Sequence, residues 1–437
     1  MAPPSRRLPR RRTRILRGIS VIAALMTLST MTGCSETRTH TEALVRVSSD
    51  ETLASAGSRV APGGLILIAP GTYHRSLQVS VNDVTVRGED RNRVIFDGQL
   101  TRQNGIVATG QRVTVENLTV RNFVQNGVLI TGMTDKDGAG IARGPDGYIA
   151  SKVPPVVPGY LVQYVTAQNN GLYGIYAFNR TGGIIRNNMA SGGSDSGVYV
   201  GQCANCDSLV ENNVLMSNAV GAEFANASHV VLLKNRIVGN RIGVSVLSNY
   251  LEAHGPSKGV SIVGNLIADN NNAQTPVQAD GAFGVGIGLG GTVNAQVRAN
   301  TIADNSSVGI WVNSSEDFAP TANSVIGNVL DGNGLDAAFT PSASAIGSGN
   351  CFELGQGATA NPTSLLAPGC ASPTAAGTFT MPQAPNGIMF SNVPHLPARP
   401  GLANLGTKTT KLPDEVTLPD LGGVVPPGSE FLAQPGG

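Results

Sequence analysis

Charged and aromatic side chains are scarce in this chain. Of its 437 residues, 14% are charged and 5% are aromatic, whereas glycine occurs 55 times. The formal net charge is +1, and much of the basic excess lies in the first seventeen residues. This balance leaves no basic field that could gather nucleic acid, so we expect no nucleic-acid partner. Abundant glycine with few aromatics favours many short strands and tight turns over a helical protein.

The first 34 residues predict an export signal. An Arg-rich stretch precedes an apolar run from about Ile19 to Met31, which is too short to cross a bilayer comfortably. The motif Met31–Cys34 resembles a bacterial lipobox, in which the cysteine becomes the lipidated first residue. We therefore expect an exported protein of the cell envelope, anchored to the membrane through lipid on Cys34. An ordinary signal peptide with an incidental cysteine is the alternative.

Four cysteines remain after Cys34, and an even number in an exported chain predicts disulfides. The expected pairs are Cys203–Cys206 across a turn and Cys351–Cys370, which would close a loop of about 20 residues worth about 3 kcal/mol. A redox site would need a βαβ context, and a structural zinc site would need more ligands nearby. A structural or metal-handling accessory protein of the envelope that uses Cys203 and Cys206 stays open as one hypothesis.

Pairs of asparagines five residues apart recur through the middle of the chain. They are Asn117/Asn122, Asn213/Asn218, Asn235/Asn240, Asn265/Asn270, Asn300/Asn305 and Asn328/Asn333, with two degraded copies at Tyr164/Asn169 and Asn188/Gly193. A period of roughly 20–30 residues predicts a solenoid, in which each repeat buries its apolar side by stacking on its neighbours. Buried asparagines at the same turn of successive coils are expected to hydrogen-bond to neighbouring backbone and side chains.

Helical spacing of apolar residues is missing from these repeats, which run from about 104 to 335. Parallel strands stacked as coils are therefore expected. Ser49 predicts an N-cap for a short helix between Leu53 and Val60, which would cover the open end of the solenoid. The expected parts are an export signal (1–34), a polar tether (35–48), a β-helix domain (49–370) with an insertion at 131–159 and smaller ones at 249–258 and 271–282, and a Pro-rich tail (371–437) that is extended or disordered.

Several stretches resemble a known family. Ala69–Tyr73 and the Asn-anchored coils resemble the right-handed parallel β-helix repeats of the pectin-lyase-like superfamily, over about residues 50–335. Tyr173–Phe178, Asp195–Cys203 and Asn350–Phe352 are similar to exported bacterial β-helix proteins of largely unassigned activity. The resemblance implies an all-β, right-handed parallel β-helix. It does not fix the function, because the superfamily includes polysaccharide lyases, hydrolases, epimerases, adhesins and a copper-maturation protein. The motifs of its polygalacturonases and alginate epimerases are missing from the sequence, which disfavours those two activities.

The strands that follow aligned glycines predict a row of outward residues. With a period of two, the second residue after each glycine faces out. This row reads Leu129, Tyr176, Tyr199, Glu223, Ser245, Gly288 and Trp311. Tyr176, Tyr199 and Glu223 belong to consecutive coils, about 4.8 Å apart. Aromatic faces beside a carboxylate suit a sugar chain, so we expect a polysaccharide partner held by Tyr176, Tyr199, Glu223 and Trp311. The rival expectation is a row covered by the 131–159 insertion.

Two further sets of residues suggest chemistry. Asp195, His229 and Lys234 lie near the tyrosines in the repeat and could supply acid–base catalysis. A lyase acting on uronic-acid polymers, with Lys234, His229 or an arginine as base, is accordingly the alternative function. Asp135 and Asp137 resemble the start of an EF-hand-like calcium loop, although the spacing of downstream acidic residues fails. Calcium is therefore the one cofactor that the sequence suggests, against a solvated turn.

Overall fold

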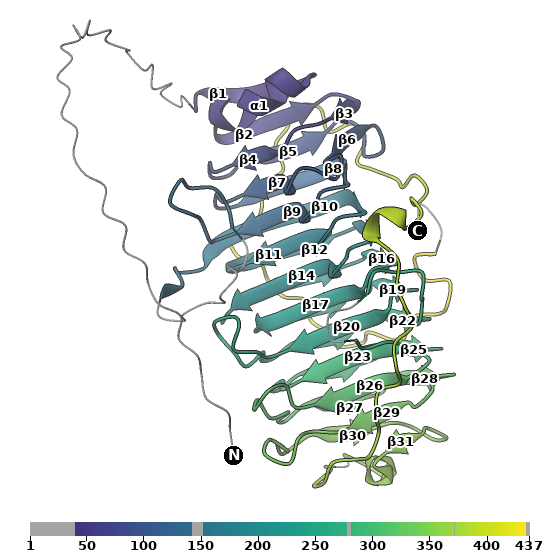
Figure 1. Ribbon diagram of the computed structural model, residues 1–437. Helices are drawn as coiled ribbons and strands as arrows, with labels where there is room; N and C mark the ends of the chain where they lie inside the picture. The colour runs from purple at the N-terminus through teal and green to yellow at the C-terminus, as the bar shows by residue number, and fades with distance from the viewer. Residues whose placement is uncertain (1–39, 142–151, 278–280, 371, 434–437) are drawn as a thin grey trace, which may run out of the picture. The chain divides into compact units, whose positions relative to one another are not determined.

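The chain forms a solenoid of stacked β-coils, in which all pairings between named strands are parallel (Figure 1). This computed structural model describes residues 40–141, 152–277, 281–370 and 372–433. The predicted export signal, including Cys34, lies outside the described residues. Among the residues described, no helix has the length and apolar character to span a membrane.

Two sheets form the sides of the coils, with 20 strands in sheet A and 11 in sheet B among the described residues. Sheet A consists of β1 (Glu42–Val47), β2 (Val60–Ile68), β3 (Gly71–Tyr73), β5 (Thr85–Gly88), β6 (Val94–Asp97), β8 (Val113–Arg121), β10 (Val157–Gln168), β12 (Arg180–Arg186), β13 (Met189–Ser191), β15 (Ser208–Glu211), β16 (Val214–Met216), β18 (Val230–Leu233), β19 (Arg236–Val238), β21 (Ser261–Val263), β22 (Leu266–Ala268), β24 (Gln296–Arg298), β25 (Thr301–Ala303), β27 (Ser324–Ile326), β28 (Val329–Asp331) and β30 (Cys351–Glu353). Sheet B consists of β4 (Leu77–Val79), β7 (Asn104–Ala108), β9 (Asn126–Thr131), β11 (Ile175–Phe178), β14 (Ser196–Cys203), β17 (Val220–Ala227), β20 (Ile242–Leu247), β23 (Val285–Gly290), β26 (Val308–Asn313), β29 (Ala337–Phe339) and β31 (Ala360–Asn361). The helical segments are α1 (Asp50–Arg59) and the 3₁₀ turns η2 (Thr363–Leu366) and η3 (Phe390–Asn392).

The core runs through the centre of the coils. The first and third residues after each aligned glycine point into it, as predicted, and Val198, Val200, Ile310 and Val312 are examples with at most 1% of their surface exposed. Burying such a side chain stabilises the fold by about 1.5–3 kcal/mol. The residue between them faces out, which confirms the predicted alternation along sheet B.

Buried asparagines join the corners of successive coils in two ladders. The first contains Asn188, Asn213, Asn235, Asn265, Asn300 and Asn328, and the second contains Asn218, Asn240, Asn270, Asn305 and Asn333. In both, each side-chain Nδ2 donates to the Oδ1 of the next asparagine at 2.9 to 3.1 Å. The backbone N–H of the same residue donates to the same oxygen. The structural role predicted for these asparagines is confirmed.

The N-terminal asparagine pairs do not join the ladders. The strand register places Asn117 and Tyr164 opposite Asn187, one residue before the ladder position at Asn188. All three have left-handed backbones, with φ of 60°, 52° and 56°. Asparagine tolerates that conformation at a sharp corner. Asn117 instead donates its Nδ2 to the carbonyl of Gly88 at 2.8 Å. The prediction of eight equivalent pairs is therefore wrong for the first two.

The N-terminal end of the solenoid is capped by a strand and a helix. Ser49 caps α1 in a capping box, in which its Oγ accepts from the N–H of Thr52 at 3.3 Å and its own N–H donates to Thr52 Oγ1 at 3.0 Å. The predicted tether (35–48) is wrong for β1, which pairs in parallel with β2. The strand forms there because Val45 and Val47 enter the core.

The Pro-rich tail is extended and lies along the coils, which is one of its two predicted states. The carbonyl of Val393 accepts from Asn169 Nδ2 at 2.8 Å, and Thr410 Oγ1 donates to Glu116 Oε1 at 3.0 Å. Residues 418–424 then pack against an apolar cluster on sheet A. Figure 1 shows the tail, in yellow-green to yellow, running along the coils. Side chains of the coils, among them Asn169 and Glu116, therefore supply hydrogen-bond partners along the path of the tail.

Replacing a central ladder asparagine should destabilise the fold. Asn235 is fully buried. Its Nδ2 donates to Val210 O and Asn265 Oδ1, and its Oδ1 accepts from Asn213 Nδ2. We expect Asn235→Ala to lower the free energy of unfolding by about 2–4 kcal/mol, because several buried groups lose partners at once. Guanidinium denaturation measures this. The control is Asn328→Ala, at the partly exposed end of the same ladder, which should cost less than half as much. Equal losses in the two variants would contradict a cooperative ladder.

Candidate functional site

Three tyrosines pack together on the outward side of sheet B. The register pairs Tyr176 of β11 with Tyr199 of β14, and Tyr199 with Glu223 of β17, so the predicted neighbours are confirmed. The ring centroids of Tyr176 and Tyr199 are 4.7 Å apart in an edge-on arrangement. Tyr173 adds a third ring at 4.3 and 4.8 Å from the other two. Tyr173 was not predicted because it precedes the aligned glycine, outside the compared positions.

This tyrosine cluster (Tyr173, Tyr176 and Tyr199) is covered by loops. Tyr176 and Tyr199 expose 1% and 2% of their surface, and Met133 of the loop after β9 joins the same apolar cluster. The Tyr199 hydroxyl donates to Glu252 Oε1, in the loop after β20, at 2.6 Å. The prediction of open ring faces for a sugar is wrong for these two tyrosines. The rival expectation, coverage by the 131–159 insertion, holds for the part of that loop that the structure describes.

Carboxylates surround the tyrosine cluster. Burial raises the pKa of Tyr199 well above its ordinary value, and the Glu252 carboxylate raises it further. The pKa of Tyr173 is raised in the same way, by burial and then by Asp195. Both phenols therefore stay protonated at neutral pH, and that of Tyr199 donates to Glu252. Asp195 lies beside the tyrosines, as the sequence predicted. Glu252 was missed because its loop interrupts the repeat and carries no positional signal.

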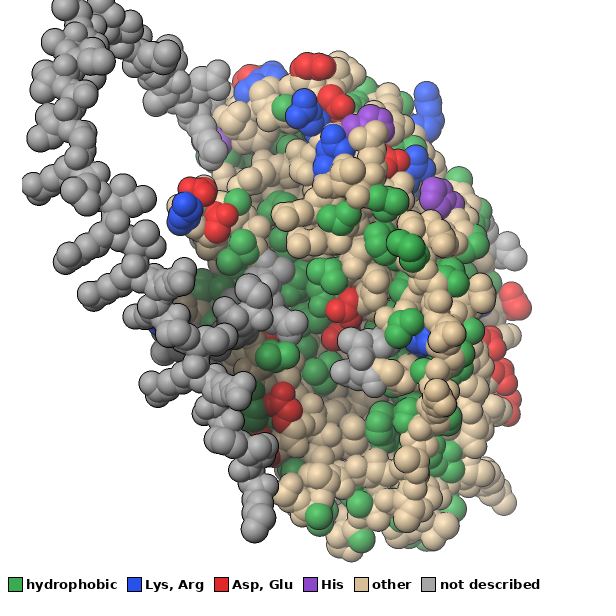
Figure 2. Space-filling model, viewed as in Figure 1, with side chains coloured by type: hydrophobic (Ala, Val, Ile, Leu, Met, Phe, Trp, Pro, Cys, Tyr) green, Lys and Arg blue, Asp and Glu red, His purple; other side chains and the backbone are tan. Residues whose placement is uncertain are grey.

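Beyond the cluster, the outward positions are partly exposed. We call Glu223, Ser245, Gly288 and Trp311 the outward row, and they pair in register across β17, β20, β23 and β26. The space above Gly288 is open, because a Cβ built there would meet only Val244 O, at 3.9 Å. Trp311 Nε1 donates to Thr340 Oγ1 at 2.7 Å, and its ring meets Phe379 of the tail edge-on at 6.2 Å. Figure 2 shows acidic side chains among hydrophobic ones along the middle of the molecule.

Asp195, His229 and Lys234 do not form one acid–base site. Asp195 precedes β14, His229 lies between β17 and β18, and Lys234 lies between β18 and β19. These are three different corners of the coil. His229 and Lys234 are exposed and have left-handed backbones, with φ of 57° and 52°. The two residues occupy tight corners of the coil. The prediction that Asp195, His229 and Lys234 form one site is therefore wrong.

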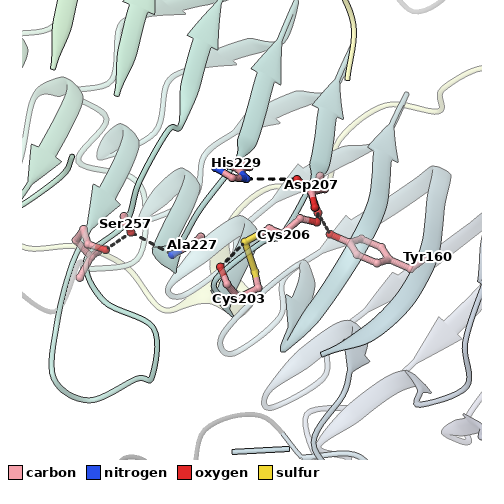
Figure 3. Close-up of a disulfide and its surroundings, with 9 residues drawn as sticks. Tyr160, Cys203, Cys206, Asp207, Ala227, His229 and Ser257 are labelled. Carbon is pink, nitrogen blue, oxygen red and sulfur yellow. Dashed lines mark hydrogen bonds and ion pairs between the residues drawn. A yellow bond between two sulfur atoms is a disulfide. The ribbon is translucent and has the colours of Figure 1, made fainter. Parts of the chain in front are cut away.

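A disulfide closes the corner between β14 and β15 (Figure 3). Cys203 and Cys206 are bonded, as are the second expected pair, Cys351–Cys370. Beside the first disulfide, His229 Nδ1 lies 3.5 Å from Asp207 Oδ1, and both side chains are about half exposed, at 47% and 46%. A disulfide offers no thiolate to a metal ion. The metal-handling hypothesis therefore loses the two ligands on which it was based.

The acidic turn after β9 is held by its own backbone. Asp135 Oδ1 accepts from the N–H groups of Asp137 and Ala139, each at 2.9 Å, in an Asx-type turn. Within the described ranges, no group of three or more His, Cys, Asp or Glu side chains is placed to hold a metal ion. Asp135 and Asp137 therefore lie in a turn that bonds to itself, and calcium at this turn stays a prediction.

Residues 159–330 match the family model described as a right handed beta helix region. This part of the chain is a right-handed β-helix, as the sequence resemblance implied. No match was found among curated proteins. Similar solved structures include the A-module of mannuronan C-5 epimerase AlgE4 from Azotobacter vinelandii, at 17% identity over 66% of this chain and 91% of that one, with a TM-score of 0.39. They also include the active domain of bacteriophage CBA120 tailspike protein 2 (13% identity, 68% and 46% coverage, TM-score 0.47) and pectate lyase Pel9A (14%, 72% and 76%, 0.39). These likenesses concern the fold alone.

Removing the Tyr199 hydroxyl should weaken the attachment of the Glu252 loop. Tyr199→Phe deletes the donor to a carboxylate that is only 7% exposed, so we expect a loss of about 1–3 kcal/mol in unfolding free energy. The matched control is Tyr250→Phe in the same loop, where the hydroxyl that bonds Asp317 is exposed. That variant should change stability by less than about 0.5 kcal/mol. Thermal or guanidinium unfolding of both variants provides the comparison, and equal stabilities would refute the role of this bond.

Proposed function

We propose that this right-handed β-helix protein recognises a polysaccharide along the outward row. The observation that supports it is the composition of this row. Two functional side chains, Glu223 and Trp311, stay partly exposed at its ends, and small residues leave the backbone uncovered between them. Glu223 and Trp311 are three coils apart, about 14 Å, which matches an elongated ligand better than a compact one.

The chemistry of the row suits sugars. A pyranose has apolar C–H faces and hydroxyl edges, so it packs on an aromatic ring and hydrogen-bonds around its rim. The Trp311 indole is already fixed by Thr340 and Phe379, so ordering it on binding costs little entropy. Oε2 of Glu223 is buried, so a sugar hydroxyl is expected to donate to the other carboxylate oxygen, in a bond stronger than one between neutral groups. The tyrosine cluster packs beside this row at its N-terminal end, where Tyr199 pairs with Glu223.

Binding to glycans tests this proposal. A glycan array should identify a ligand. Trp311→Ala should raise the dissociation constant of that ligand by about tenfold or more, equivalent to about 1.4 kcal/mol. Glu223→Gln should weaken it by a smaller factor. Val329→Ala is the control, because it truncates an exposed side chain on β28 of sheet A. No ligand on the array, or a Trp311→Ala protein that binds like the wild type, would end the proposal.

The lyase alternative has a separate readout. An ultraviolet assay for unsaturated products, run on the same glycans, detects cleavage of uronic-acid polymers by elimination. No observation of the described residues favours this reaction, since His229 and Lys234 lie at separate corners. Product formation without a loss on Trp311→Ala would replace recognition along the outward row with catalysis elsewhere.

We further propose that the chain is exported and anchored to a membrane of the cell envelope by lipid on Cys34. The Arg-rich and apolar segments before Cys34 support this, and the two disulfides fit an oxidising compartment. In a bacterial host fed labelled palmitate, the wild type should carry label and sediment with membranes. Cys34→Ala should lose both properties. Equal labelling of the two proteins would contradict the anchor.

A further inference from the structure

A pocket open to solvent lies where the tail crosses the corners of three coils on the sheet A side. Its volume is about 290 Å³. The polar side chains that line it are Arg91, Tyr164, Asn187, Asn188, Asn212 and Arg399. Every one of these can donate a hydrogen bond, and among the described residues no acidic side chain lines the pocket. Tyr164, Asn187 and Asn212 take equivalent left-handed corner positions, so the repeat itself places them side by side.

Arg91 gives this pocket a buried positive charge. Its side chain is 4% exposed, and its guanidinium donates to Thr166 Oγ1 at 2.9 Å, Val165 O at 3.0 Å and Pro400 O at 2.8 Å. All three acceptors are neutral. Among the described residues, no carboxylate forms an ion pair with Arg91. Buried charges in proteins are ordinarily paired, so the guanidinium has an uncompensated charge beside an open space.

Neighbouring arginines strengthen the positive field. Burial, followed by the charge of Arg399, lowers the pKa of Arg91 to about 10. Burial and then Arg236 lower the pKa of Arg399 in turn. The acidic groups Glu430 and Asp269 act on Arg236, at the edge of this group, and not on Arg91. Arg91 and Arg399 both line the pocket, and two like charges side by side favour a ligand of the opposite sign.

Arg180 shows which part of this arrangement is unusual. It is also buried and forms no ion pair among the described residues, but its guanidinium donates to the carbonyls of Gly110 and Gly159 at 2.9 and 2.7 Å and lies over the Tyr160 ring at 6.0 Å. Burial of an arginine among carbonyls is therefore no sign of a ligand in this fold. Arg91 differs because it lines a pocket together with a second arginine.

We infer that this pocket binds a small oxyanion, a carboxylate, sulfate or phosphate group. Guanidinium forks match the paired oxygens of such groups, and the free carboxamides of Asn187 and Asn212 add neutral donors. The volume lies at the low end of small-molecule sites, which span roughly 300–1,000 Å³. It accommodates one charged group of a ligand and not a sugar chain. The site lies on the sheet A side and does not depend on the outward row of sheet B.

Titration of the full chain with three probes tests this inference. Sodium galacturonate, sulfate and phosphate are compared by calorimetry at constant ionic strength, with chloride as the reference salt. At least one should bind saturably with a dissociation constant at or below about 1 mM. The tightest probe identifies the source of the oxyanion: galacturonate indicates an acidic sugar, and sulfate or phosphate a free ion or an ester.

Two substitutions should weaken this binding. Arg399→Gln removes one charge, and Asn187→Asp places a carboxylate in the pocket with nearly the same shape, at a corner conformation that aspartate also tolerates. Each should weaken the best probe by about tenfold or more. Arg75→Gln, an exposed arginine that does not line the pocket, is the matched control and should bind like the wild type. Absence of saturable binding by all three probes, or unchanged binding by both pocket variants, would overturn the inference.

Discussion

A side-chain carboxamide that hydrogen-bonds to the same group of the next coil is the interaction on which this β-helix depends. Each coil must turn sharply between two strands of sheet A, and the groups at that corner are out of reach of the strand ladder. Asparagine resolves this, since it donates and accepts at once. In Asn213, Asn235 and Asn265, one oxygen accepts both the backbone and the side-chain N–H of the preceding asparagine, with all three residues fully buried. An unsatisfied corner would cost about 1–3 kcal/mol for each group.

Because the corners are fixed, equivalent residues of successive coils lie in rows. The loops and the tail then determine which of these rows are buried and which stay exposed. On sheet B, loops after β9 and β20 cover the tyrosine cluster, whereas Glu223 and Trp311 remain partly exposed. On sheet A, the tail crosses the coils and buries charged groups. Arg87 and Glu116 form a 2.7 Å ion pair beneath Thr410. The same tail closes one side of the pocket at Arg91. The repeat supplies regular positions, and irregular segments turn them into surfaces.

The sequence was sufficient for features that repeat. Glycine alignment assigned Tyr199 and Glu223 to neighbouring strands, and cysteine parity and spacing anticipated both disulfides. The sequence left open whether the tyrosines are covered, and it gave no sign of Glu252, which lies 53 residues after its partner Tyr199 in a loop without periodicity. The path of the Pro-rich tail could not be predicted either. Backbone carbonyls of the tail accept hydrogen bonds from side chains of the coils, and such contacts leave no pattern in the side chains of the tail. The first two sequence pairs were wrongly aligned with the ladders. Asparagine occurs both at the left-handed corner position and at the ladder position that follows it, as Asn187 and Asn188 show.

Hydrogen exchange at the corners tests the central claim most directly. The backbone N–H groups of Asn213, Asn235 and Asn265 lie at turns, where they would exchange quickly if only the strands were hydrogen-bonded. Because each donates to a buried side chain of the next coil, peptides that span these corners should exchange as slowly as those of the strands on either side. Mass spectrometry of the native protein can compare them with the exposed turn at Asp135–Ala139. Exchange at the corners as fast as in that turn would contradict the ladder as the interaction that holds the coils in register.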